Sequence, residues 1–305
     1  MPKPAILAVI IASALVVRAS EAQQASWPAA RSRHHLIYDP LQRQMLLLGG
    51  AADTAMWIWT GTTWQRSSRT VPPRANEAVA FDARRRRIVM HGGSDRPDET
   101  FEFDGRQWHS VAASGPGKRG HHSLIFDPVR NHMLLFGNND DTPTTDTWAW
   151  DGRSWMKIAD TGPPARGVMA ATFDPRREVV VVFGGCCARG FLGDTWEWDG
   201  RRWTQIATPT SPSPRYDARI VYDPARKRVV LFGGQGPNGA FGDTWEYDGR
   251  SWTKLDVAGP SPRSAHAMVY DPRGKAILLF GGRQGRTALD DFWSFDGVWR
   301  RIPEP

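Results

Sequence analysis

Cysteine is nearly missing from this sequence of 305 residues, and the two that occur are neighbours, Cys186 and Cys187. Such a pair can form a strained vicinal disulfide or remain as two thiols, but neither state joins distant parts of the chain. Two adjacent cysteines without a second pair also do not match a structural zinc site. The fold must therefore be stabilised by packing rather than by crosslinks.

Helical periodicity and long apolar runs are also lacking. No long stretch repeats apolar residues at the i, i+3, i+4, i+7 spacing of an amphipathic helix. The one extended apolar run, Ala5 to Val17, is too short to cross a bilayer comfortably. It follows Lys3 and precedes Ser20-Glu21-Ala22, whose small residues fit a signal-peptide cleavage site.

We therefore predict a secretory signal peptide at residues 1–22, cleaved after Ala22, and an exported mature chain, 23–305, in a periplasm or outside the cell. The alternative is a membrane anchor, which Arg18 after the apolar run favours. No cysteine follows the run, so a lipoprotein is not expected. No later segment is apolar enough to span a membrane, and we expect none to do so after cleavage.

Tryptophan and glycine, in contrast, are abundant, with 15 and 30 residues, and the glycines recur with a period. Gly-Gly pairs, replaced once by Gly-Asn, follow one another at intervals of 43, 45, 47, 49 and 48 residues. A fixed period in this range indicates a propeller or a solenoid. The six pairs are Gly49-Gly50, Gly92-Gly93, Gly137-Asn138, Gly184-Gly185, Gly233-Gly234 and Gly281-Gly282.

All six units share one order of features. An arginine is followed by an apolar run that ends in an aromatic residue and Asp, usually Asp-Pro, and by a second apolar run that ends at the glycine pair. A variable loop, an Asp-Thr-Trp-x-Trp-Asp-Gly segment and a final Trp-x-x-Ile/Leu/Val complete the unit. We predict four strands of about four to six residues per unit, separated by these turn signals. The units open at Arg31, Arg74, Arg119, Arg166, Arg215 and Arg263.

The tryptophan-rich segment is predicted to be scaffold rather than a site. GDTWEWDGRRWTQI, from Gly193 to Ile206, recurs as GDTWEYDGRSWTKL, from Gly242 to Leu255. In Trp196-Glu197-Trp198 the two indoles share one face of a strand and Glu197 takes the other. Wide, stiff side chains at one position of every unit suit the packing of stacked blades.

The opening arginine, the two apolar strands that end at Gly-Gly, the spaced aromatic residues and the final tryptophan resemble the kelch repeat of β-propellers. The resemblance covers residues 27–305. Trp198-Asp199 also resembles a WD40 signature, but the Gly-Gly pair and the tryptophan five residues later favour kelch. The resemblance implies an all-β, six-bladed propeller with four antiparallel strands per blade, closed by packing of the last unit on the first or by a borrowed strand.

By the same resemblance, the first strand of each blade is innermost and starts at the mouth of the central channel. Residues that differ between units at this place are candidates for a site, because the shared ones hold the scaffold. We predict that Arg33, Asn76, His121 and Asp217, with Tyr216 as an aromatic wall, bind a small polar ligand or an acidic peptide loop. The alternative is a solvated rim without a ligand. The full ring, two positions after each arginine, is Arg33, Asn76, His121, Val168, Asp217 and Ala265.

Three further patterns invite a site, and in each we favour the simpler interpretation. His34, His122 and His266 share one position, where a metal site is an alternative to the packing role that histidine commonly has in kelch repeats. The loop 138–142 is oxygen-rich but lacks the spacing of a known calcium loop. The run Arg84–Arg87 in a chain of net charge +7 suggests nucleic acid, but its register is that of a solvated hairpin turn. We therefore predict no metal, no cofactor and no nucleic-acid partner.

Two kelch enzyme classes bear comparison. Copper radical oxidases need tyrosine, histidine and a cysteine crosslinked to tyrosine, but Tyr38, Tyr222 and Tyr270 occupy the repeated Tyr-Asp-Pro position, so that chemistry is not expected. Sialic-acid mutarotases are exported six-bladed kelch proteins that need acid–base groups in the channel. Arg33, His121 and Asp217 fit that alternative by residue type.

The leading hypothesis is a monomeric, exported, non-catalytic binding module that presents one face to a protein, peptide or glycan partner. No catalytic residue is assigned. The variable loops, such as the one that carries Phe191-Leu192 beside the cysteine pair, are candidates for the partner surface. The alternatives are an enzyme of the mutarotase type and a structural part of a larger envelope complex.

Overall fold

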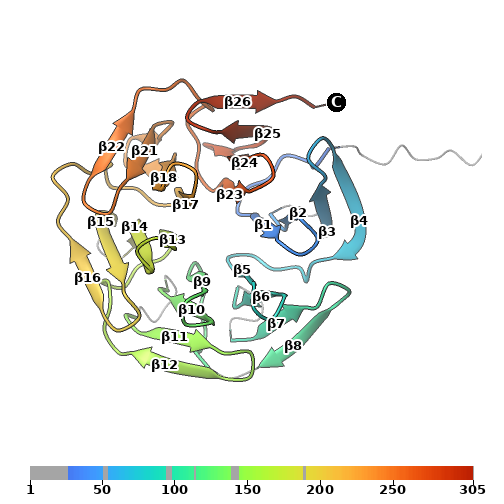
Figure 1. Cartoon of the computed structure of the whole chain (residues 1–305), viewed down its shortest axis with the longest axis vertical. Helices are drawn as coiled ribbons and strands as arrows, with labels where there is room; N and C mark the ends of the chain where they lie inside the picture. Colours follow the sequence, from blue (N-terminus) through green and yellow to red (C-terminus); the bar gives the residue numbers. More distant parts are fainter. Residues whose placement is uncertain are drawn as a thin grey trace, which may run out of the picture.

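The chain folds into a ring of six antiparallel sheets around a central axis (Figure 1). The computed structural model describes residues 27–50, 54–93, 98–112, 115–138, 144–187 and 190–304. Within these residues all regular structure is β-structure, so no helix among them is long and apolar enough to cross a membrane. The prediction of an all-β, six-bladed propeller with four antiparallel strands per blade is confirmed.

The first three blades consist of four strands each, in the order of the sequence. Blade 1 contains β1 (His35–Asp39), β2 (Gln44–Leu48), β3 (Ala55–Trp59) and β4 (Trp64–Thr70). Blade 2 contains β5 (Ala78–Asp82), β6 (Arg87–His91), β7 (Thr100–Phe103) and β8 (Trp108–Ala112). Blade 3 contains β9 (Ser123–Asp127), β10 (His132–Phe136), β11 (Thr147–Trp150) and β12 (Trp155–Ala159).

The last three blades add to this plan between their second and third strands. Blade 4 contains β13 (Ala170–Asp174), β14 (Val179–Cys187), β15 (Gly190–Trp198) and β16 (Trp203–Ile206). Blade 5 contains β17 (Arg219–Asp223), β18 (Arg228–Phe232), β21 (Thr244–Tyr247) and β22 (Trp252–Leu255), with a separate hairpin of β19 (Gln235–Gly236) and β20 (Gly239–Ala240). Blade 6 contains β23 (Ala267–Asp271), β24 (Ala276–Gln284), β25 (Thr287–Phe295) and β26 (Trp299–Ile302). Four of these strands have nine residues, so the prediction of uniformly short strands was wrong there.

The innermost strands are β1, β5, β9, β13, β17 and β23, as the resemblance implied (Figure 1). Because the four strands of a blade alternate in direction, the start of each inner strand and the loop between the second and third strands lie on one face of the ring. The two hairpin turns of each blade lie on the opposite face. We call these the mouth face and the turn face.

The core consists of apolar clusters between neighbouring blades rather than one central core. One such cluster joins blades 3 and 4, where Trp196, Trp198 and Trp203 pack against Leu134 and Phe136. On the other face of the same strand, Glu197 binds Arg177, so the predicted division of Trp196-Glu197-Trp198 between two faces is confirmed. Neighbouring blades therefore bury apolar side chains against each other all around the ring.

The ring closes by packing of blade 6 on blade 1. Each sheet of the described residues is built from one contiguous segment, so no strand is borrowed among them. The amide of Arg31 donates to the carbonyl of Leu289 at 3.0 Å, and the amide of Gly282 donates to the carbonyl of Arg31 at 2.9 Å. Trp27 adds a hydrogen bond from its indole to the carbonyl of Asp290 at 2.8 Å and packs on Phe280.

The final tryptophan of most blades is anchored to the preceding blade by a hydrogen bond. The indole of Trp252 donates to the hydroxyl of Thr195 at 2.9 Å, and Trp155, Trp203 and Trp299 bind Thr100, Thr147 and Thr244 in the same way. At the two remaining joints the threonine is replaced by Met56 and Phe292. The buried indole nitrogens that face them, on Trp108 and Trp64, have no hydrogen-bond partner among the described residues.

Replacing Thr195 with valine keeps the shape of the side chain but removes the acceptor of the Trp252 indole. We expect the free energy of unfolding to fall by about 1–2 kcal/mol, because a buried donor is left without a partner. Urea denaturation followed by tryptophan fluorescence measures this change. The control is Thr204→Val, at an exposed position of β16. An equal loss of unfolding free energy in both variants would show that the indole hydrogen bond does not stabilise the fold.

Candidate functional site

The mouth of the channel is a ring of six residues with left-handed backbone conformation. Their φ angles lie between 49° and 65°, which is uncommon for residues other than glycine. Backbone hydrogen bonds join the ring from blade to blade, for example from the amide of His121 to the carbonyl of Asn76 at 2.9 Å and from that of Asp217 to Val168 at 2.9 Å. The ring residues are Arg33, Asn76, His121, Val168, Asp217 and Ala265. The backbone is the same in all six blades, and only the side chains differ.

Three of the predicted residues meet on one side of the ring. The guanidinium of Arg33 donates to Oδ1 of Asn76 at 2.6 Å and lies 3.0 Å from Nε2 of His121. Arg33 therefore bridges blades 1, 2 and 3 across the mouth. The bonds hold its charge at the opening of the channel, where a ligand that enters would meet it first.

Asp217 belongs to a second group at the mouth. Its carboxylate is buried, and Oδ2 lies 3.6 Å from Nη2 of Arg283 in the long hairpin of blade 6. Arg219, two residues after Asp217 and further into the channel, also faces this region. Burial lowers the pKa of Arg219, and the nearby Asp217 opposes that shift. The mouth thus carries more cationic than acidic groups, which favours an anionic or acidic ligand.

Below the mouth the channel contains a cavity of about 200 Å³. Arg33, Asn76, His121, Val168 and Asp217 line it, together with residues that the sequence analysis did not single out. The missed polar residues are His35, Glu77, Ser123 and Arg219. Three of these lie four positions after the opening arginine, so extending the comparison of units by two positions would have found them.

His35 and Glu77 face each other on the wall of this cavity, with 3.4 Å between Nε2 and Oε1, and form an ion pair when the imidazole is protonated. The imidazole is partly exposed and the carboxylate is buried. A histidine next to a carboxylate is an arrangement that can accept and return a proton. It is therefore the group in the cavity that an acid–base reaction would use.

Tyr216 does not line the channel cavity; it lies beside the mouth and stacks on Phe191, with ring centroids 5.6 Å apart and planes 27° from parallel. Phe191 is exposed to 38% and lines a second pocket of about 550 Å³ between blades 4 and 5. Phe241 lines the same pocket and carries the guanidinium of Arg215 3.8 Å from its ring centroid. The aromatic groups and the polar mouth are thus neighbours on one face.

The three histidines at the next position pack between blades. Nε2 of His34 lies 3.0 Å from the carbonyl of Phe280 in the neighbouring blade, and the ring meets Phe280 edge-on. His266 packs in the same manner on Phe232. His122 contacts His91 with centroids 5.4 Å apart. Among the described residues no group of three or more His, Cys, Asp or Glu is placed to hold a metal ion.

Some predicted features lie wholly or partly outside the described residues. These are the signal peptide at residues 1–22, most of the oxygen-rich loop 138–142 and the side chain of Cys187. Asn138 is described: its Oδ1 accepts from the amide of Gly120, so it serves the scaffold. In the run Arg84–Arg87 the prediction of a solvated turn holds for Arg84 and Arg86, whereas Arg85 inserts between Asp82 and Glu102.

Burial, reinforced by nearby arginines, lowers the pKa of the interblade histidines well below the ordinary value, and lowers that of His91 to about 3. The folded protein therefore binds fewer protons than the unfolded chain below pH 6.5, and stability falls as the pH falls through that value. For each such histidine we expect a loss of about 1.4 kcal/mol per pH unit.

Urea denaturation at pH 7.5 and pH 5.5 measures this effect as a lower midpoint at pH 5.5. His266→Gln removes one titrating group, so its loss between the two pH values should be smaller than that of the wild type. The exposed His109 is the control, since His109→Gln leaves the buried groups in place. An unchanged pH dependence in His266→Gln would contradict the interpretation.

Comparison with known proteins agrees with this architecture. The profile of the KLHDC2/KLHL20/DRC7 Kelch-repeats domain matches residues 98–259 and 200–303, which together cover more than half of the chain. No curated protein matches the sequence. The family match and the six blades built on one repeated pattern point to the same conclusion: the chain belongs to the kelch-repeat family of β-propellers.

Proposed function

We propose that this protein is an exported, non-catalytic module that binds a segment of a protein or peptide on the mouth face of its propeller. Kelch propellers are typically protein-interaction modules, and this coarser role follows from the family. The observation that carries the finer proposal is the exposed Phe191, which stacks on Tyr216 beside a cationic channel mouth. The repeat does not require this arrangement, because other blades have no counterpart of Phe191 at its position in the sequence.

The apolar part of the proposed surface is the pocket between blades 4 and 5. Phe191, Pro214, Pro237 and Phe241 supply its apolar walls. Exposed aromatic and proline side chains in a concave site are typical of surfaces that bind an aromatic or aliphatic side chain of a partner. The hairpins that carry Phe191 and Pro237 extend beyond the shared plan of the blades. Their backbone also accepts the amides of Arg215 and Arg263 in the next blades, so the pocket is held rigidly on the ring.

The polar part is the channel mouth with the cavity below it, where Arg33, Arg219 and Arg283 outnumber the acidic Asp217 and Glu77. A peptide segment that places an apolar side chain between Phe191 and Phe241 can direct a nearby acidic side chain toward these arginines. Arginine binds carboxylates with directed, paired hydrogen bonds, which gives such a segment its orientation. The proposal needs no cofactor and no second copy of the chain, and closure of the ring within one chain supports a monomer.

An enzyme of the mutarotase type is the second candidate, and the His35–Glu77 pair in the channel favours it. Ring opening of a sugar needs a group that removes a proton and one that returns it. Arg33 would then bind the carboxylate of an acidic sugar at the mouth. The cavity of about 200 Å³ has room for only a small substrate. Under this hypothesis the aromatic pocket between blades 4 and 5 takes no part in the reaction.

Selection of random displayed peptides on the mature protein should enrich sequences that combine an aromatic or aliphatic residue with an acidic one. For a selected peptide, titration calorimetry should show at least a tenfold loss of affinity in Phe191→Ala and in Arg33→Ala. The second variant is compatible with the backbone, because Ala265 occupies the same ring position with φ 55°. Met156→Ala is the control, since Met156 is exposed on the outer strand of blade 3.

Equal affinity in all variants would place the partner elsewhere and contradict the proposed surface. If no peptide is enriched but N-acetylneuraminic acid binds and its anomers exchange faster, with loss in Glu77→Gln, the enzyme candidate would replace the binding module. Proton NMR of the sugar measures that exchange directly.

Export predicts a mature protein that begins at Gln23. Expression of the full chain in a secreting bacterial host, followed by fractionation and intact mass measurement, should give this N-terminus outside the cytoplasm. Ala22→Arg should block processing, because the position before the cleavage site requires a small residue. A full-length chain that stays in the membrane fraction in both cases would instead support the anchor alternative.

A further inference from the structure

A pocket on the turn face, opposite the channel mouth, is lined almost entirely by arginine. It lies between blades 4 and 5 and has a volume of about 390 Å³. Arg176 and Arg177 come from the hairpin turn between β13 and β14, Arg228 begins β18, and Arg250 comes from the turn between β21 and β22. Asp248 is the only acidic side chain in the lining.

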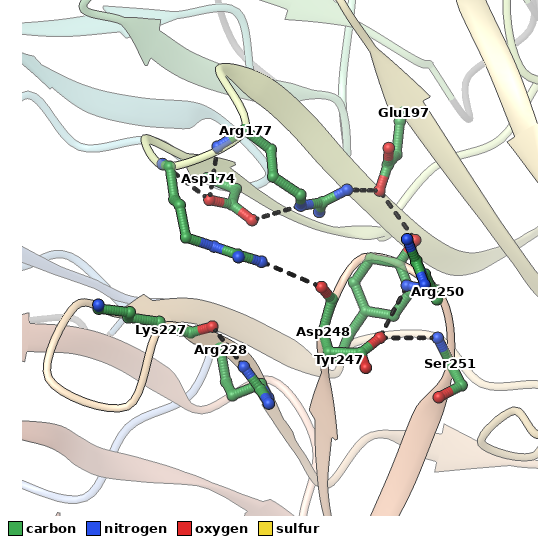
Figure 2. A network of polar contacts seen from close by, with 10 residues as sticks. Asp174, Arg177, Glu197, Lys227, Arg228, Tyr247, Asp248, Arg250 and Ser251 are labelled. Carbon is green, nitrogen blue, oxygen red and sulfur yellow. Dashed lines mark hydrogen bonds and ion pairs between the residues drawn. The ribbon is translucent and has the colours of Figure 1, made fainter.

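The scaffold accounts for part of this cluster. The Nε of Arg177 donates to Asp174 at 2.7 Å and its Nη1 donates to Glu197 at 2.5 Å (Figure 2). The guanidinium of Arg176 donates to the carbonyl of Asp248 at 3.2 Å. The bonds of Arg177 fix it within blade 4, and the bond of Arg176 joins blade 4 to the outer turn of blade 5, so this wall of the pocket is ordered without a ligand.

One donor of this fixed wall is left over. Nη2 of Arg177 is buried and has no hydrogen-bond partner in the part of the chain that the structure describes, although the other two nitrogens of the same group are bound. A buried charged donor without an acceptor costs more than an ordinary polar group and is uncommon in native proteins. Arg177 therefore keeps unused hydrogen-bonding capacity next to the pocket, although the nitrogen itself is covered by its neighbours.

The opposite wall has two arginines that the scaffold does not use for ion pairs. Among the residues that the structure describes, the guanidinium of Arg228 donates only to the carbonyl of Lys227, and the exposed side chain of Arg250 makes no ion pair. The carboxylate of Asp248 accepts the amides of Arg250 and Ser251 at 2.8 and 2.9 Å (Figure 2). Burial raises its pKa, but these two bonds and Arg228 outweigh that and lower it, so it stays ionised without neutralising all four arginines.

Comparison of the six joints shows that this cluster is not a consequence of the repeat. In sequence register, the positions of Arg176, Arg177, Arg228 and Arg250 are all arginine only at the joint of blades 4 and 5. At the joint of blades 3 and 4 the corresponding residues are Val129, Arg130, Val179 and Arg201. A fold that tolerates valine at two of these positions does not need arginine there for stability.

We propose that this pocket is a binding site for a tetrahedral oxyanion, a phosphate or sulfate group carried by an anionic partner. Guanidinium groups present paired donors that match the oxygens of such groups. Asp174 and Glu197 neutralise Arg177, but the lining still has Arg176, Arg228 and Arg250 against the single acid Asp248, an excess that suits an anion of about two charges. The site lies on the face opposite to the proposed peptide surface, so the two can be tested separately.

The test is titration calorimetry of the mature protein with inorganic sulfate, inorganic phosphate, pyrophosphate and a short sulfated oligosaccharide. Each variant uses a residue found at the same position of another blade: Arg228→Val follows Val179, and Arg250→Thr follows Thr62. We expect at least one probe to bind, with affinity reduced tenfold or more in each variant and further reduced in the double variant. Thermal unfolding without a ligand should change little, because Arg250 is exposed and Arg228 contributes only one exposed hydrogen bond, to the carbonyl of Lys227, and a weak attraction to Asp248.

The matched control is Arg201→Thr, which removes the same charge from the corresponding turn of blade 4. Binding that falls equally in this control would show general attraction to a basic protein and overturn the site. Failure of all four probes to bind the wild type would overturn it as well. A preference for the oligosaccharide or for pyrophosphate would identify a sulfated or a phosphorylated carrier, and both support the oxyanion site.

Discussion

The buried arginine that opens each unit is the interaction on which the rest of the propeller depends. In all six blades its Nη1 donates to the carbonyl of the first residue of the glycine pair, eighteen residues later. In blade 5 the guanidinium of Arg215 also binds both oxygens of Asp243, at 2.5 and 3.0 Å. One arginine side chain therefore connects the start of the first strand, the end of the second and the start of the third. The backbone carbonyl of Arg215 also accepts the amide of Gly185 and so links blade 5 to blade 4.

This anchor explains why the glycine pair and the variable ring occur together. The glycine pair lies close to the backbone of the arginine segments of its own blade and of the next one. A Cβ on Gly185 would lie 2.8 Å from the carbonyl oxygen of Gly167, and Gly185 has a φ of 106°. The residue two positions after the arginine has a left-handed backbone conformation. Its backbone is hydrogen-bonded to the equivalent residues of neighbouring blades. Since the backbone does the structural work at that position, its side chain is free to vary. Arg33, Asp217 and Ala265 therefore occupy equivalent places with unrelated chemistry.

The same division explains what could be predicted from the sequence. Contacts within one unit recur six times, so the period revealed the blades, their strands and the ring that contains Arg33, Asn76, His121 and Asp217. Contacts that occur once leave no repeated signal. The extension of β14 and β15, which brings Phe191 onto Tyr216, depends on one hairpin, and the approach of Arg283 to Asp217 depends on the hairpin of the next blade. Neither is visible in the local sequence.

The net charge of +7 shows why composition alone is a poor guide to the partner. Much of the arginine is neutralised inside the scaffold: Arg119, Arg166, Arg215 and Arg263 each pair with an aspartate, and Arg85, Arg177 and Arg226 pair with a glutamate of their own blade. These charges hold strands together and offer little to a ligand. What remains is distributed unevenly, with Arg33, Arg219 and Arg283 at the channel mouth and Arg228 and Arg250 beside the turns of blades 4 and 5. The charge that matters for recognition is therefore the charge that the shared contacts of the repeat leave unpaired, and these arginines lie on both faces of the propeller.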